Sequence, residues 1–146
     1  MAVAAEVAVR EWINSKTDLV GMGNPLALGA FLIEQASPAD GAYAVIARSS
    51  EGVTRVVSEP APGVGVARMQ CLVYAGTEEA SEPAAAALRR AFESLSGCPE
   101  PCGDTGVWAL VTENLIGPIF VPHQGDTGEI YAFQVDADFL LRDDTV

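Results

Sequence analysis

The chain of 146 residues contains few basic side chains. Eight lysines and arginines and a single histidine stand against twenty aspartates and glutamates, which gives a formal net charge of −12 at pH 7. A protein that grips nucleic-acid phosphates needs clustered lysine and arginine, so this charge argues against phosphate binding. Two interpretations of the acidity stay open: it keeps the protein soluble, or it lets a surface lie near nucleic acid without adhering to it.

Long apolar segments and targeting signals are absent as well. No apolar run approaches the roughly 18–20 residues that cross a bilayer. The first six residues contain no basic group ahead of an apolar stretch, so the sequence predicts no signal peptide. We therefore expect a protein without a membrane partner that is made and kept in the cytosol. Its length suits one domain, residues 1–146, and a hydrophobic fraction of 49% predicts a folded core.

Cysteine is scarce, and the three present do not form a familiar motif. Cys98 and Cys102 are separated by three residues, whereas redox and zinc motifs have a spacer of two. A zinc site would need Cys71 and His123 as further ligands. Cys71 lies within an expected strand and is most simply a small buried apolar residue. The sequence predicts free thiols, and a Cys98–Cys102 disulfide across a proline-rich turn is the alternative.

No catalytic motif is present, and the groups that could do chemistry are few. His123 lies in an expected loop, and no serine or cysteine has the setting of a nucleophile. Asp136 and Asp138 lie on one face of an expected strand, about 7 Å apart, a spacing that would suit hydrolysis of a sugar or binding of a hard cation. Aromatic residues, which line sugar clefts, make up only 7% of the chain. We therefore expect an acidic solvated face and no catalytic, cofactor-binding or metal-binding residue, so that the protein is not an enzyme.

The strongest pattern in the chain is the alternation over residues 129–142. Successive side chains of a strand point to opposite faces of a sheet. One face of this strand carries apolar residues, namely Tyr131, Phe133, Val135, Ala137, Phe139 and Leu141. The other face carries Asp136 and Asp138. At roughly 3.3 Å per residue the strand would span about 40 Å, enough to serve several neighbours or to reach past its own subunit.

The remaining elements follow from periodicity and turn composition. Residues 2–16 read as a helix with Trp12 as its bulky anchor, whereas Val3 and Val7 lie on another side and suggest a second packing surface. A second helix is expected from the N-cap Ser81 to Gly97. Strands are expected at 43–48, 66–75, 107–113, 119–122 and 129–142, with a short strand or apolar plug at 29–35 and a short strand at 53–57 inside a loop. The sequence predicts an α+β fold: a mostly antiparallel sheet of four to five strands, two helices packed on one face, and a long C-terminal β-hairpin.

The C-terminal part of this pattern resembles a known family. The resemblance is carried by the run Gly117-Pro118-Ile119-Phe120-Val121-Pro122, the Gly/Asp turn after it and the long alternating strand. These features are similar to those of the tail terminator proteins of long-tailed bacteriophages, especially those of actinobacterial hosts. The resemblance covers most of the chain as a pattern, but residues 49–65 and 98–102 have no counterpart. It implies a hexameric ring that caps the tail tube, ends tube polymerisation and joins the tail to the head connector. The ring would assemble in the host cytoplasm and lie at the head-proximal end of the virion tail, with DNA passing through its lumen without specific binding.

The resemblance also implies roles for particular residues. The subunit contacts would come from the first helix and the long strand, at Val3, Val7, Trp12, Tyr131, Phe133 and Phe139. Asp136 and Asp138 would belong to an acidic face toward the lumen, and the partners would be the tail tube protein and the connector protein. A head–tail connector or neck completion protein is the alternative within the same assembly. A small α+β ligand-binding or hydrolytic domain that uses Asp136, Asp138 and His123 is the alternative from a different class.

Overall fold

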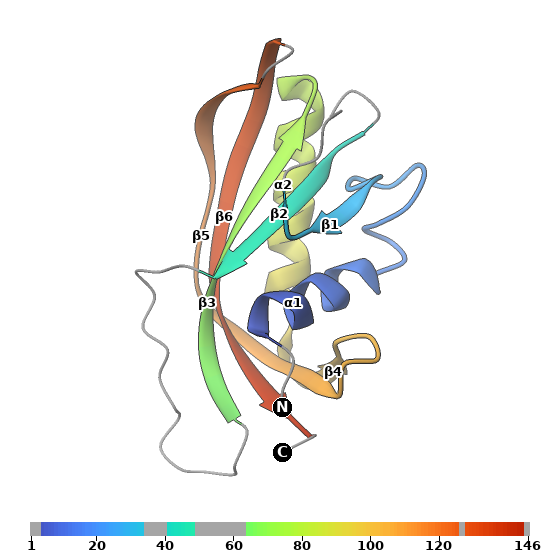
Figure 1. Ribbon diagram of the computed structural model, residues 1–146, viewed down its shortest axis with the longest axis vertical. Coiled ribbons are helices and arrows are strands. Elements are labelled where there is room, and N and C mark those ends of the chain that lie inside the picture. Colours follow the sequence, from blue (N-terminus) through green and yellow to red (C-terminus); the bar gives the residue numbers. More distant parts are fainter. Residues whose placement is uncertain (1–3, 34–40, 49–63, 126–127, 145–146) are drawn as a thin grey trace.

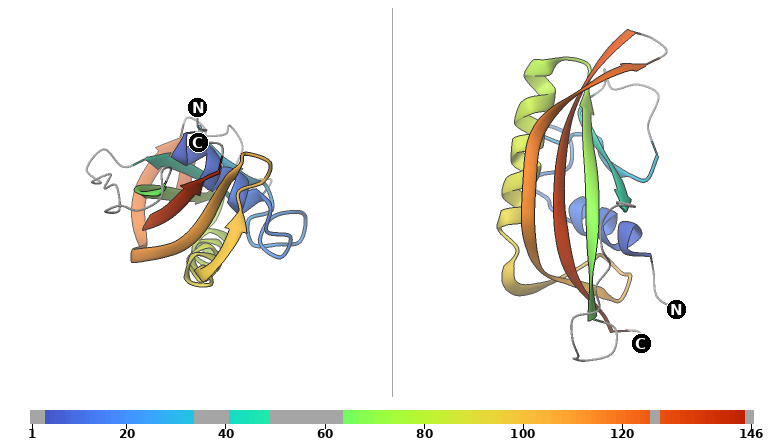
Figure 2. Two further views of the ribbon diagram at one scale, coloured as in Figure 1. Left: turned by 90° about the horizontal axis from the view of Figure 1, so that it is seen from below. Right: turned by 90° about the vertical axis from the view of Figure 1, so that its left-hand side faces the viewer.

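The computed structural model describes residues 4–33, 41–48, 64–125 and 128–144, and for Glu78, 122–125 and 128–131 it describes the main chain alone. The elements in chain order are α1 (Ala5–Asn14), β1 (Gly29–Phe31), β2 (Tyr43–Arg48), β3 (Val64–Ala75), α2 (Glu78–Glu93), β4 (Ser96–Pro101), β5 (Val107–Gly125) and β6 (Gly128–Asp143). The six strands form one sheet in the order β1-β2-β3-β6-β5-β4. Only β1 and β2 run parallel, and all the other neighbours are antiparallel. The sheet curls, and both helices lie on the same side of it (Figures 1 and 2).

The core lies between the helices and the concave side of the sheet. Alternate residues of β3 and β6 are buried on this side, which are Ala67, Met69, Cys71 and Val73 on β3 and Phe133, Val135, Ala137, Phe139 and Leu141 on β6. Three aromatic rings join the layers at its centre: Trp12 of α1 lies 5.9 Å from Phe92 of α2 and 5.7 Å from Phe139 of β6. The Phe92 and Phe139 rings are 5.0 Å apart. The period-two pattern predicted for residues 129–142 is confirmed from Phe133 to Leu141, where alternate residues of β6 are buried against the helices.

The second helix begins earlier than predicted. Thr77 is its N-cap, and the Thr77 hydroxyl accepts a hydrogen bond from the Ala80 amide at 3.2 Å. Ser81, the predicted N-cap, is buried inside the helix, and Pro83 lies in the helix interior. The prediction was wrong because Thr77 is followed by two glutamates that suit the positive end of the helix dipole, so the helix gains a full turn.

The sheet has six strands, whereas the sequence predicted four to five. The additional strand β4 was expected to be a turn because of its prolines, yet it pairs with β5 through Ser96↔Val111, Glu100↔Ala109 and Pro101↔Trp108. Proline cannot donate to a ladder and is therefore tolerated on an edge strand, which is where β4 lies. Residues 114–118, which separate two strands expected at 107–113 and 119–122, are also part of a strand, because β5 extends over 19 residues.

The cysteines are free, as predicted. Cys71 and Cys102 are buried and Cys98 is exposed. Cys98 lies on β4 and Cys102 follows its last residue, so four steps of extended chain lead from one to the other, a span on the order of 13 Å that is too long for a disulfide. Burial raises the pKa of the Cys71 thiol and raises that of Cys102 to about 12, so neither of them is a nucleophile at neutral pH.

The short strand expected at 53–57 lies outside the described residues. Among the residues that the structure describes, no helix is long and apolar enough to cross a membrane.

Candidate functional site

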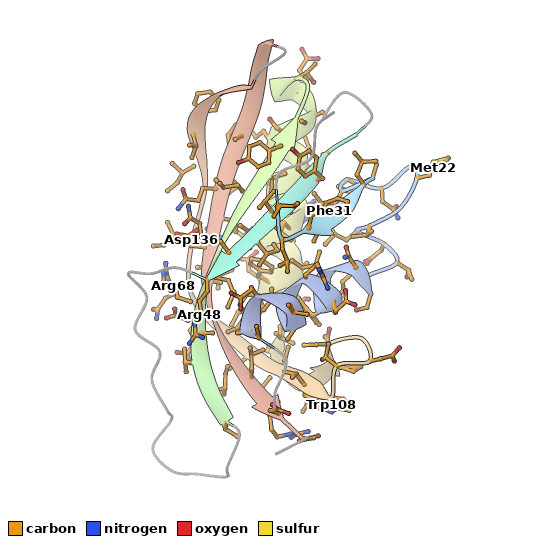
Figure 3. All side chains as sticks on the ribbon, viewed as in Figure 1. Met22, Phe31, Arg48, Arg68, Trp108 and Asp136 are labelled. Carbon is orange, nitrogen blue, oxygen red and sulfur yellow. The ribbon has the colours of Figure 1, made fainter. Side chains whose placement is uncertain are left out.

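The face of the sheet that points away from the helices carries the predicted acidic residues. Asp136 and Asp138 alternate along β6 with the buried residues Val135, Ala137 and Phe139, which point to the other face of the sheet. Their cross-strand partners on β3 are Gln70 and Arg68. Figure 3 labels Arg68 and Asp136, both of which lie near mid-height of the sheet in that view. No helix of the described chain covers this face (Figure 2), which we name the open face.

Asp138 is held in a network of three side chains. Arg68 Nη1 donates to Asp138 Oδ1 at 3.1 Å, and Asn114 Nδ2 donates to Asp138 Oδ2 at 2.8 Å. The same Arg68 nitrogen also donates to the Asn114 carbonyl oxygen at 3.3 Å. The side chains of Arg68 and Asp138 are only 18% and 16% exposed, so solvent screens this ion pair less than a surface pair. The Asp138 carboxylate is therefore neutralised and ties β3, β6 and β5 together.

Asp136 has a different environment. Its Oδ2 accepts a hydrogen bond from Gln134 Nε2 at 2.9 Å, whereas its buried Oδ1 has no hydrogen-bond partner among the described residues. The charges of the two aspartates are thus unequally compensated, since only Asp138 of the two has a cationic neighbour at ion-pair distance in the described chain. The described residues contain no group of three side chains that could bind a metal ion. The side chain of His123 lies outside the described part.

An irregular stretch of β5 faces this network. Each of three steps along β5 inserts one extra residue opposite β6, between Ala109 and Val111, Glu113 and Ile116, and Ile116 and Ile119. Asn114 and Gly117 have positive φ values of 53° and 104°. A Cβ atom on Gly117 would lie 2.2 Å from the Gln134 carbonyl oxygen, so only glycine fits at this close approach. Arg89 of α2 donates to the Gly117 carbonyl and fastens the irregular stretch to the helix.

Beyond this point β5 forms a free edge of the sheet. Its partner on the far side, β4, reaches only Val111, and the described strand then continues to Gly125. Three large apolar side chains stand out here: Ile116, Ile119 and Phe120 are 46%, 49% and 47% exposed. Ile119 and Phe120 are adjacent and point to opposite faces of the sheet, and both are half exposed because no strand covers the edge between them. We name these three residues the edge patch.

A second group of exposed apolar side chains lies at the other end of the sheet. Met22, Leu28 and Ile33 are 100%, 36% and 73% exposed, and they flank β1, the opposite terminal strand. Met22 lies on the far side of the molecule from β5 (Figures 1 and 3). The loop that carries Met22 is held in shape by Asn24, whose side-chain amide donates to the Thr17 and Val20 carbonyls at 2.9 and 3.0 Å.

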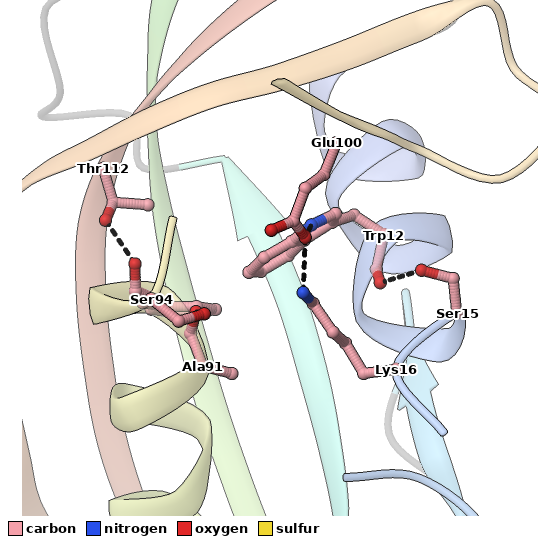
Figure 4. A network of polar contacts seen from close by, with 8 residues as sticks. Trp12, Ser15, Lys16, Ala91, Ser94, Glu100 and Thr112 are labelled. Atoms are coloured by element: carbon pink, nitrogen blue, oxygen red, sulfur yellow. Dashed lines mark hydrogen bonds and ion pairs between the residues drawn. The ribbon is translucent and has the colours of Figure 1, made fainter. Parts of the chain in front are cut away.

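A polar network fastens the edge strand β4 to α1 (Figure 4). Trp12 Nε1 donates to Glu100 Oε1 at 2.9 Å, Lys16 Nζ pairs with the same oxygen, and Lys16 Nζ lies 4.7 Å from the Trp12 ring centroid. Burial of Glu100 opposes its ionisation, but hydrogen bonds from Lys16 and Trp12 outweigh this and hold the pKa of the carboxyl below its ordinary value. The network stabilises an otherwise weakly paired strand.

A cleft of about 270 Å³ lies between α2 and the loop that follows α1. Its charged lining residues are Lys16, Asp18 and Arg90. Since they are of mixed sign, and Lys16 is already paired with Glu100, they do not favour one class of ligand.

The residues predicted as subunit contacts do not form one surface. Trp12 and Phe139 have no exposed area and Phe133 is 6% exposed, so these three belong to the core of the subunit and have no area to offer a partner. Val7 is half-buried on α1, and Val3 lies outside the described residues. The main chain of Tyr131 pairs with Ala75 and Pro122, and its side chain is not among those described.

The exposure of the edge patch was not predicted, although a signal for it is present in the sequence. Ile119 and Phe120 were predicted only as strand residues. Pro118 and Pro122 interrupt the hydrogen-bond donors of β5, and proline within a strand indicates an edge.

These features define an α+β protein whose curled sheet is covered by helices on one side and has exposed apolar side chains at both ends. No family model, curated protein or solved structure matches this chain.

Proposed function

We propose that this chain is the subunit of a homo-oligomeric ring, and that the ring is a tail terminator of a long-tailed bacteriophage. The ring caps the tail tube, ends its polymerisation and joins the tail to the head connector. The observation that carries the proposal is the free edge of β5 with its half-exposed edge patch.

The edge patch supports assembly because natural sheets normally protect their edges. Short edge strands, charged side chains and covering loops prevent edge-to-edge pairing. In β5 the edge instead exposes Ile116, Ile119 and Phe120. Exposed apolar patches of this kind mark interaction sites. Gly117 to Pro122, one part of the pattern that carries the resemblance to tail terminators, belong to this edge and include Ile119 and Phe120.

The charge of the chain supports a role beside DNA. At −12 per subunit, a ring repels phosphates and lets DNA slide through its lumen. Asp138 contributes less to this repulsion than Asp136 does, since Arg68 neutralises it. The lumen therefore draws its charge mainly from carboxylates other than Asp138.

The proposal is tested with the full chain in two steps. Light scattering coupled to size-exclusion chromatography, over a range of concentrations up to about 1 mM, should give a single species of several subunits, seen as rings by negative-stain electron microscopy. Adding the protein to the tail tube protein encoded by a neighbouring gene should shorten the tubes and place density at one end of each. A protein that stays monomeric at 1 mM and leaves tube length unchanged contradicts the proposal.

A head–tail connector or neck completion protein remains the second candidate, because it is also an acidic ring. Co-sedimentation separates the two: a terminator pellets with polymerised tubes, whereas a connector pellets with DNA-filled heads. A hydrolytic domain is the third candidate. Asp136→Asn combined with Asp138→Asn would abolish its activity against a glycoside panel, and detection of such an activity in the wild type would displace the structural role.

A further inference from the structure

We propose that residues 98–105, which comprise the greater part of β4 and the turn after it, open away from the rest of the protein as one unit, and that the contact of Glu100 with Trp12 and Lys16 controls how often they open. We name these residues the flap. Opening of the flap is a property of the single subunit and does not depend on assembly into a ring, so it goes beyond the proposed function.

The flap is weakly attached to the sheet. β4 lies at the end of the strand order, and its residues with a register partner on β5 are Ser96, Glu100 and Pro101, with a shift of register between the first two. Every residue of β4 is exposed except Glu100, which is half-buried. Pro99 and Pro101 have no N–H to donate. β4 therefore contributes few ladder hydrogen bonds and little apolar burial, and segments of this kind open before the core of a protein does.

A carboxylate and a thiol side chain hold the flap closed. Glu100 Oε1 accepts a hydrogen bond from Trp12 Nε1 at 2.9 Å and pairs with Lys16 Nζ (Figure 4). The side chains of Glu100 and Lys16 are 31% and 20% exposed, so solvent screens their pair only in part. The Cys102 side chain is fully buried in the core. Because hydrogen bonds to a charged group contribute more to stability than neutral ones, the contact of Glu100 opposes opening.

The turn within the flap is held together by its own hydrogen bonds. The Cys102 carbonyl accepts from the Thr105 amide at 3.3 Å and from the Thr105 hydroxyl at 2.7 Å. Two bonds cross to β5 and break on opening: the Cys102 amide donates to the Val107 carbonyl at 2.9 Å, and the Val107 amide donates to Thr105 Oγ1 at 3.2 Å. Gly97 and Gly106 flank the flap with φ values of 105° and 81°. Because glycine adopts both positive and negative φ, these two positions can act as hinges.

Opening of the flap changes what β5 and Cys102 expose. The main chain of β5 from Trp108 to Val111 loses its strand partner, so the free edge of β5 becomes longer. The Cys102 thiol, buried while the flap is closed, comes into contact with solvent. Since a buried thiol is inert and an exposed one reacts, Cys102 reports the opening of the flap. Cys71 is buried on the central strand β3, so its reaction reports the opening of the core instead.

Alkylation of the two buried thiols in one sample tests the inference. The exposed thiol is first removed by Cys98→Ser. Iodoacetamide then reacts with a thiolate that opening has exposed: the sulfur bonds to the methylene carbon, iodide leaves, and the thiol proton passes to water. Peptide mass spectrometry measures the rate at each cysteine, at reagent concentrations where the rate is proportional to concentration and so reports the population of the open form.

A separate opening of the flap predicts different rates at the two cysteines. Cys102 should react at least about tenfold faster than Cys71, because the flap opens more often than the core unfolds. The rate at Cys102 should also depend less on urea, since opening the flap exposes less surface than unfolding the core.

Two matched variants test the contact of Glu100. Glu100→Ala should raise the rate at Cys102 by about tenfold, because it removes the charge-assisted contact. It should raise the rate at Cys71 by a similar factor, since the unfolded core lacks this contact too. Asp104→Ala is the control: it removes an exposed acid from the turn of the same flap, and it should change the rate at Cys102 by less than about twofold.

A core variant tests whether the flap opens by itself. Val73→Ala removes two methyl groups from a fully buried position on β3 and should raise the rate at Cys71 by about tenfold. The rate at Cys102 should stay the same, because the contacts of Val73 are intact while only the flap is open.

Four outcomes overturn the inference. If Cys102 reacts no faster than Cys71 and with the same dependence on urea, or if Val73→Ala raises both rates equally, the flap opens only when the core unfolds. If Glu100→Ala leaves the rate at Cys102 unchanged, or if Asp104→Ala raises it as much, the contact of Glu100 does not control opening. Far-ultraviolet circular dichroism checks that each variant is folded. Glu100→Gln, which keeps the size of the side chain and should raise the rate at Cys102 in the same direction, replaces Glu100→Ala if that variant does not fold.

Discussion

Gly117→Ala should destabilise the protein far more than the same change at Gly97, although the two glycines have nearly the same backbone conformation. Their φ values are 104° and 105°, a region that costs a residue with a side chain about 1–3 kcal/mol. The positions differ in their surroundings. A Cβ atom on Gly97 meets nothing within 4 Å, whereas on Gly117 it lies 2.2 Å from the Gln134 carbonyl oxygen and 3.2 Å from the Val135 Cα atom.

The clash of the added Cβ atom with Gln134 and Val135 determines how much more Gly117→Ala destabilises the protein than Gly97→Ala does. The atoms of Gln134 and Val135 belong to the main chain of the central strand β6, so they cannot move aside as the end of a flexible side chain would. Relieving the clash requires β5 to shift by about 1 Å and weakens the neighbouring ladder hydrogen bonds, which are worth about 0.5–1.5 kcal/mol each. We expect about 1–2 kcal/mol for Gly97→Ala and about 3–5 kcal/mol for Gly117→Ala.

Urea unfolding followed by circular dichroism measures both values under identical conditions. It should be run at a protein concentration where the variants are monomeric, since assembly would add its own stability. If Gly97→Ala and Gly117→Ala lower the free energy of unfolding by the same amount, the clash with Gln134 contributes nothing, because the positive φ that both positions share would then account for the whole destabilisation. Gly117→Ala should also reduce assembly, since it displaces the strand that presents Ile116 and Ile119.

Three further predictions concern single contacts. Glu100→Gln removes the negative charge from the network with Lys16 and Trp12. Because the pKa of Glu100 is lowered in the folded state, the wild type should be more stable than the variant above the ordinary carboxyl pKa, and this difference should vanish as pH falls through the lowered value. Thermal unfolding of both proteins between pH 3 and 7 measures it. Arg68→Ala should cost about 2–3 kcal/mol in urea unfolding, because it leaves the Asp138 carboxylate partly buried without its cation, and Arg68→Ala with Asp138→Ala should recover part of this loss. Thr77→Ala should cost about 1 kcal/mol and reduce helical signal, and an unchanged stability would mean that α2 begins at Ser81 after all.

Much of the fold followed from local pattern. The alternation of β2, β3 and β6 is a direct consequence of burying one face of a strand, so their positions were predicted within two residues. The first helix and its anchor Trp12 follow from apolar spacing in the same way. The start of α2 and the strand β4 were not predicted, because Thr77 and Ser81 are both good caps and Cys98-Pro-Glu-Pro-Cys102 has the composition of a turn. Which cap is used and whether the prolines lie in a strand depend on what packs beside them.

The candidate surfaces show the same division. Sequence by itself determined that the chain is acidic, that it has a core-forming C-terminal strand, and that Asp136 and Asp138 share one face of it. Only the tertiary structure decided that Trp12, Phe133 and Phe139 are core residues and that Ile116, Ile119 and Phe120 are exposed. The sequence shows that a residue is apolar, but it does not show whether another strand or helix covers that residue. The order of the strands decides this, and β4 is too short to cover the edge of β5.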